Sequence, residues 1–186
     1  MTTKKFYKLK FDSDNENFAT LNSVTETTYE FNQSFNGDSQ LKSWKPIIIQ
    51  KSKDNNTADI ADANAFPLFP IFSKKAIECL MPVMANDIEI LPLIFNDDAD
   101  KFFGINIIKV LDVVDYNKSD IVRFKNSNKI LAFRKIVLKN ELITDNIFKI
   151  IDMPIGCQQF VSEEFKKIVK ENNLTGFIFE PVNDDN

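Results

Sequence analysis

Histidine is missing from this 186-residue chain. Its absence excludes Ser–His–Asp and Cys–His catalysis, histidine-based zinc sites and the commonest general base. Glycine occurs only four times, in neither a GxxxxGK[ST] nor a GxGxxG pattern, so there is no recognisable phosphate-binding loop. No run approaches the roughly 18 apolar residues of a membrane span, and the first five residues lack the apolar segment of a signal peptide. We therefore expect a cytoplasmic protein that does not enter a membrane.

Arginine is almost as rare as histidine. Arg123 and Arg134 are the two arginines among 23 basic residues, and arginine is the side chain that best reads phosphates and base edges. The formal net charge is only −4, with no strong bias between the two parts of the chain on either side of residue 65. We therefore expect no nucleic-acid binding.

The chain has two cysteines and no pairing pattern. Cys79 lies on the apolar side of a predicted helix, where a small buried side chain is the expected role. Cys157 follows a glycine in a predicted loop. A disulfide between the two stays open, although an intracellular chain does not normally need one.

Phenylalanine, by contrast, is abundant. The chain has 18 phenylalanines and 44% hydrophobic residues, which is enough for one aromatic-rich core in a single domain over residues 1–186. Residues 160–182 read as a helix followed by a strand, with Ser162 as the N-cap and apolar residues at helical spacing. Gly176 precedes the strand Phe177–Phe179, so we expect a backbone conformation there that other residues resist.

The same strand–helix–strand pattern occurs 89 positions earlier. This shift places Ser162 on Ser73 and Pro181 on Pro92. A true duplication and two independent packing solutions both explain it, and the small number of identities favours the second. Within the earlier helix Pro82 disfavours α geometry at the preceding residue, so we expect a kink or a break there.

The other apolar segments alternate as strands do. They favour an α+β fold, a largely antiparallel sheet with two short amphipathic helices packed on it. Residues 102–115 have a long β-branched run and predict a central strand. The other predicted strands are residues 6–11, 44–49, 88–95, 121–124, 129–138 and 147–151.

Carboxylates are the remaining candidates for chemistry. A calcium loop read from Asn96 fails, because Lys101 stands where glycine is required and Ile107 where glutamate is required. Asp112 and Asp115 have no partner base, and bracing the turn that follows them is the favoured role. We therefore expect no catalytic residue, no cofactor and no metal.

Several blocks of the sequence carry a family resemblance from Pro67 onwards. They are PLF with FSKKAIECLMP, then EILPL, INIIKVLDVVDYNKSDI, IFKI and FVSEEFKKIVKENNLTGFIFEPV. In order and spacing these blocks resemble an immunity-protein family of bacterial polymorphic toxin systems, the eleventh of its series and formerly a domain of unknown function. The characteristic positions are Ser73, Pro92, Asn106, Asp112, Asp115, Ser119, Phe148, Val161, Ser162, Leu174, Gly176, Phe179 and Val182.

The resemblance implies a non-enzymatic protein that binds and neutralises a cognate toxin. Residues 65–186 would be the family-like strand–helix–strand core. Residues 1–64, rich in β-favouring and loop residues, match little and would vary with the partner. Partner binding is therefore predicted on aromatic residues of this part and on nearby acidic turns. The candidates are Tyr29, Phe35, Trp44, Asp59, Asp62, Asp97 and Asp98.

Two other classes stay open at this point. One is a carboxylate-based enzyme, with or without a metal, and a metal-dependent shift of the melting temperature would favour it. The other is a structural or regulatory interaction module, and a dimer that forms without a toxin partner would favour it. The sequence does not name the toxin, its activity or the oligomeric state.

Overall fold

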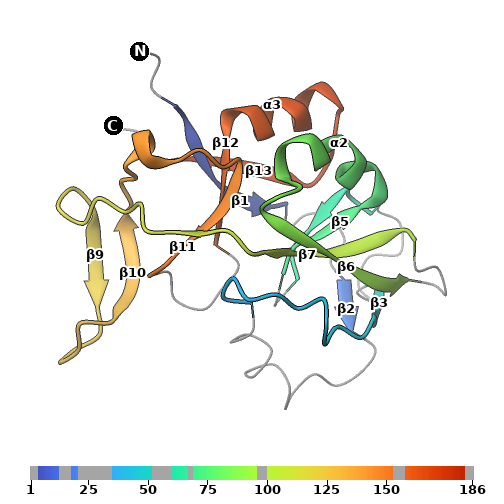
Figure 1. The fold of residues 1–186 in the computed structure, drawn as a ribbon, viewed down its shortest axis with the longest axis horizontal. Helices are drawn as coiled ribbons and strands as arrows, with labels where there is room; N and C mark the ends of the chain where they lie inside the picture. Colours follow the sequence, from blue (N-terminus) through green and yellow to red (C-terminus); the bar gives the residue numbers. More distant parts are fainter. Residues whose placement is uncertain are drawn as a thin grey trace.

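Three β-sheets and two α-helices make up the described part of the chain (Figure 1). In this computed structural model the described residues are 4–12, 18–20, 35–51, 60–66, 69–95, 100–152 and 158–182. Pairing is mostly antiparallel, so the predicted α+β class with two short helices is confirmed. Neither described helix is long and apolar enough to cross a membrane.

The first large sheet joins the two ends of the chain. Its five strands lie in the order β13–β1–β12–β11–β8, and all neighbours are antiparallel except β11 and β8. The N-terminal strand β1 therefore lies between two strands from the C-terminal part. The strands are β1 (Phe6–Phe11), β8 (Val110–Leu111), β11 (Ile147–Ile150), β12 (Gln159–Ser162) and β13 (Phe177–Pro181).

The second large sheet has six strands in the order β2–β3–β6–β7–β5–β4. All neighbours are antiparallel except β3 and β6. The strands are β2 (Phe18–Thr20), β3 (Ile47–Lys51), β4 (Ala63–Asn64), β5 (Ile71–Ser73), β6 (Ile88–Phe95) and β7 (Phe102–Ile107).

The apolar run 102–115 does not form the single central strand that we predicted. It gives β7 in the six-stranded sheet and then β8 in the other sheet. Between them, the backbone N–H groups of Ile108 and Lys109 both donate to the carbonyl of Asp87. These bonds turn the chain out of the six-stranded sheet, so the run connects the two sheets.

A hairpin stands apart from both sheets. Its strands β9 (Asp120–Arg123) and β10 (Ile130–Lys135) pair only with each other among the described residues. In Figure 1 it extends from the body of the molecule. A short 3₁₀ turn, η1 (Asn140–Leu142), follows it.

The helices α2 (Lys74–Met84) and α3 (Glu163–Glu171) contact each other and lie side by side in Figure 1. The predicted N-caps are confirmed: Ser73 Oγ accepts from the N–H of Ala76 at 3.1 Å, and Ser162 Oγ from that of Phe165 at 3.2 Å. We expected a kink or a break before Pro82, and the break does not occur. Pro82 lies in the last turn of α2, so the helix loses one hydrogen bond there and still continues to Met84.

The two strand–helix–strand units share more than a pattern. Strand β7 lies between β5 and β6, and β1 lies between β12 and β13. The register also agrees at the shift of 89, because Ile88 faces Ile107 where Phe177 faces Phe11. In both units the cap serine donates its hydroxyl to an Asx side chain, Ser73 to Asp62 at 2.7 Å and Ser162 to Asn146 at 2.6 Å. Shared topology, register and cap contacts favour a duplication over two independent packing solutions.

The cap serines carry a testable stability prediction. We expect Ser73→Ala and Ser162→Ala each to lower the free energy of unfolding by about 1 kcal/mol, because a first-turn N–H loses its acceptor. Urea denaturation measures the effect, with Ser162→Thr as the control that keeps a hydroxyl. Unchanged stability of both alanine variants would contradict a structural role for the caps.

Candidate functional site

Two of the predicted aromatic anchors lie together in the structure. Phe35 and Trp44 both pack against Phe69, with ring centroids 5.0 and 5.6 Å away. Phe35 is only 6% exposed, and the Trp44 indole N–H donates to the carbonyl of Pro92 at 2.9 Å. Both side chains therefore take part in a core cluster, and their role in partner binding stays a prediction. Tyr29 lies outside the described residues.

Of the predicted acidic contacts, only Asp62 lies among the described residues. Its carboxylate accepts from the hydroxyl of Ser73 and, at 3.0 Å, from the N–H of Thr175. Asp62 thus joins the start of α2 to the loop before β13. Three predicted acids lie outside the described residues: Asp59, Asp97 and Asp98.

Alanine variants separate the two roles of Trp44. From its packing, we expect Trp44→Ala to lower the free energy of unfolding by roughly 2 kcal/mol, less than for a fully buried tryptophan. Trp44→Phe is the control that keeps an aromatic ring. Melting temperature and affinity for the binding partner are both measured, for these variants and for alanine variants of the other six predicted contacts. If partner binding is lost only where stability is lost, this predicted interface is wrong.

A buried carboxylate anchors the segment that carries these aromatics. Glu89 is 8% exposed, and it accepts hydrogen bonds from the Ser39 hydroxyl, the Gln40 N–H at 2.8 Å and the Asn106 amide at 2.9 Å. Asn106 also donates to the carbonyl of Asp38. Burial raises the pKa of Glu89, but the bonds from Ser39, Gln40 and Asn106 outweigh it and leave the pKa below its usual value.

Sequence reasoning missed this anchor. Glu89 counted only as the polar position of an alternating strand, and Asn106 only as a family position. Both interrupt apolar strands, however, and in the antiparallel pair β6–β7 they face each other. A polar residue in each of two adjacent apolar strands is the signal that would have found them.

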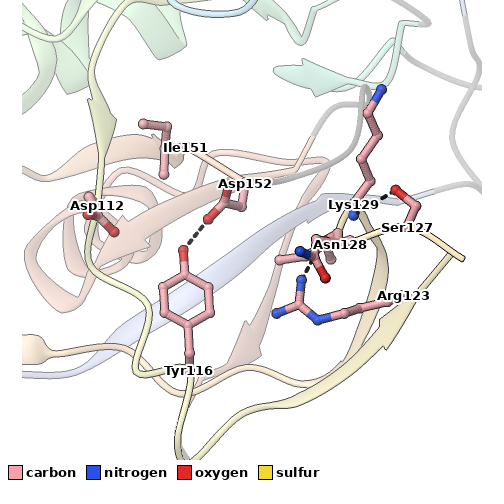
Figure 2. Close-up of a pocket in the computed structure, with 9 residues that line it drawn as sticks. Asp112, Tyr116, Arg123, Ser127, Asn128, Lys129, Ile151 and Asp152 are labelled. Carbon is pink, nitrogen blue, oxygen red and sulfur yellow. Dashed lines mark hydrogen bonds between the residues drawn. The ribbon is translucent and has the colours of Figure 1, made fainter.

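A cavity of about 720 Å³ opens between the hairpin and the end of β11. One wall carries Tyr116, whose hydroxyl donates to the carboxylate of Asp152; the opposite wall carries Arg123 and Lys129 (Figure 2). Burial, followed by the hydrogen bond and charge of Asp152, raises the pKa of Tyr116 to about 12. The phenol therefore stays protonated at neutral pH and keeps donating to Asp152.

We predicted that Asp112 and Asp115, beside this cavity, brace the turn that follows them. Asp115 braces the next turn: its carboxylate accepts from the N–H of Asn117 at 3.2 Å, and its carbonyl from the hydroxyl of Ser119 at 2.8 Å. Asp112 instead lines the cavity. Within the described ranges, no three His, Cys, Asp or Glu side chains gather as metal ligands would. The predicted absence of a metal stays a prediction.

Part of the chain, including the cavity, matches a known protein family. A model of an immunity protein family, Imm11, matches residues 95–184. These residues, a little under half of the chain, are similar to the Imm11 family. The match confirms the predicted family resemblance, and no curated protein matches the chain.

The Imm11 match runs from the end of β6 past the end of β13. It includes β7, the hairpin with its cavity, and the whole unit β12–α3–β13. The blocks at PLF, FSKKAIECLMP and EILPL, which also suggested the family, precede the matched residues. Trp44, Asp62 and Glu89 precede them as well, whereas Tyr116 and Arg123 lie within the Imm11 part.

Proposed function

We propose that this chain is a cytoplasmic immunity protein of a bacterial polymorphic toxin system, which binds a cognate toxin and neutralises it without catalysing a reaction. The Imm11 match over residues 95–184 is the observation that carries the proposal. Binding alone is sufficient for such a function, because a protein that covers a toxin's active surface blocks it at equimolar concentration.

The experiment begins with the toxin-like protein encoded beside this chain's gene in the native host. Producing that protein alone should arrest growth, and producing it with this chain should restore growth. With both proteins purified, we expect a stable complex in size-exclusion chromatography. No rescue and no complex would contradict the proposal.

Stoichiometry then separates binding from catalysis. A binding inhibitor should abolish toxin activity only when the chain reaches the toxin concentration, and dissociating the complex should recover active toxin. Neutralisation by far less than one equivalent, with toxin that stays inactive after separation, would show an enzyme instead. The same titration in EDTA tests the predicted independence from metals.

A further inference from the structure

The hairpin β9–β10 and its flanks concentrate positive charge. Residues 118–139 hold seven basic residues and one acidic residue, a formal charge of +6 in a chain of −4. The remainder of the chain therefore carries −10. Both arginines of the protein, Arg123 and Arg134, lie in this hairpin. Basic and acidic residues nearly balance on either side of residue 65, so a comparison of those two parts does not reveal this local excess of positive charge.

Four cations of the hairpin have no acidic partners among the described residues. Lys118, at the base, pairs with Asp115 at 3.3 Å. In the described ranges no carboxylate lies within ion-pair distance of Arg123, Lys125, Lys129 or Arg134, and all four are exposed. Arg123 donates to the carbonyl of Asn128, which uses one of its five N–H groups.

Apolar side chains are exposed between these cations. Phe124 is 50% exposed and Leu131 46% exposed. Ile121, Val122 and Ile130 are half-buried and belong to none of the three core clusters. A two-stranded hairpin with this little burial is marginally stable by itself, so a partner that covers it would gain apolar contact and stabilise it.

The cavity of Figure 2 supplies a recess beside the same surface. Its hairpin wall is cationic through Arg123 and Lys129. On the other wall the carboxylate of Asp152 is already engaged by the hydroxyl of Tyr116. A carboxylate that enters the recess would therefore meet the guanidinium of Arg123 on the hairpin side, which has N–H groups left to donate.

We propose that the hairpin β9–β10 docks an acidic, partly apolar surface of a protein partner. Carboxylates of the partner pair with Arg123, Lys129 and Arg134, and its apolar side chains cover Phe124 and Leu131. A protein fits better than a nucleic acid, because a long polyanion would meet the −10 of the remaining chain and would leave the apolar side chains uncovered. Identifying this partner as the toxin rests on the proposed function.

A defined probe tests the docking surface without the toxin. The full chain, labelled with ¹⁵N, is titrated in NMR with a glutamate–tyrosine copolymer, with polyglutamate and with duplex DNA at equal charge concentration. We expect chemical-shift changes confined to residues 116–139 and 151–152, with the copolymer binding several-fold more tightly than polyglutamate. Tightest binding by duplex DNA, or shifts elsewhere only, would overturn the proposal.

Variants with matched charge assign the effect to the hairpin. R123Q/R134Q should weaken copolymer binding at least about tenfold, whereas K5Q/K170Q, which removes two charges elsewhere, should change it less than about twofold. Phe124→Ser should reduce the preference for the copolymer over polyglutamate. Equal melting temperatures establish that each variant is folded. Equal losses in both double variants would overturn the hairpin assignment.

The toxin experiment then assigns the partner. If the wild-type chain neutralises the toxin, R123Q/R134Q should raise the concentration needed at least about tenfold. Full neutralisation by this variant would overturn the toxin as the hairpin's partner. If the wild-type chain neutralises nothing, the proposed function fails, and the copolymer titration still decides whether the hairpin docks an acidic protein surface.

Discussion

Replacing Gly176 with alanine is expected to lower the free energy of unfolding by more than about 3 kcal/mol. Gly176 has φ +86°, in the left-handed region that L side chains rarely adopt. A Cβ built on it would lie 2.1 Å from the carbonyl oxygen of Ala63 and 2.8 Å from the Ala61 methyl group. The first of these neighbours is backbone, so rotating a side chain does not relieve the clash. Urea denaturation measures the loss.

The same site ties the two strand–helix–strand units together. The N–H of Ala63 donates to the carbonyl of Thr175, and the N–H of Asp12 to the carbonyl of Gly176. Moving the backbone away from an added Cβ would therefore disturb β4 and β1 along with β13. The matched control is Asn173→Gly, at the end of α3, where φ is +50° in a non-glycine residue. We expect that variant to change stability by less than about 1 kcal/mol. If Gly176→Ala leaves the free energy of unfolding unchanged, the contact between Gly176 and the carbonyl of Ala63 is not tight.

The features predicted correctly from the sequence depend on neighbours along the chain. Ser162 precedes an amphipathic helix by one residue, and Gly176 stands between the end of that helix and a strand. Both local signals hold in the structure. Pro82 was a local signal that failed, because a proline in the last turn of a helix costs one bond and leaves no later turn to break.

The features that escaped prediction depend on contacts across the sheet. Strand β1 comes from the N-terminus, yet it occupies in one unit the place that β7 occupies in the other. Comparing the sequence at a shift of 89 cannot reveal this, since the two inserted strands stand on opposite sides of their helices in chain order. The cluster of basic residues on the hairpin was not predicted for a related reason. Its cations come together only when residues 120–123 pair with residues 130–135.

The buried anchor at Glu89 is the second site of large expected effect. We expect Glu89→Ala to lower the free energy of unfolding by about 3–4 kcal/mol, because three donors, two of them in buried hydrogen bonds, lose one charged acceptor. Two of them, the N–H of Gln40 and the amide of Asn106, point at the same carboxylate oxygen, Oε2. The loss should also loosen the segment from Phe35 to Trp44, which NMR or proteolysis would detect.

Glu89→Gln should separate the contribution of the side chain's hydrogen bonds to stability from the contribution of its charge. The glutamine oxygen can take the place of Oε2, and its amide N–H can donate to the Ser39 hydroxyl, which otherwise donates to Oε1. All three contacts are then kept, so at neutral pH we expect a loss of less than about 1.5 kcal/mol. A loss as large as that of Glu89→Ala would show that charge, and not hydrogen bonding, stabilises this site.

The pH dependence gives the sharper test of the same anchor. The pKa of Glu89 in the folded protein is lowered from its usual 4.5, so the charged form stabilises the folded state. That stabilisation is complete above the unfolded-state pKa and is lost as the pH falls through the folded-state pKa. We therefore expect the stability difference between the wild type and Glu89→Gln to be constant near neutral pH and to shrink below about pH 4.5. Urea denaturation of both proteins from pH 7 to pH 3 measures this difference. A difference that grows as the pH falls would mean that the folded-state pKa is raised, and that burial outweighs the hydrogen bonds from Ser39, Gln40 and Asn106.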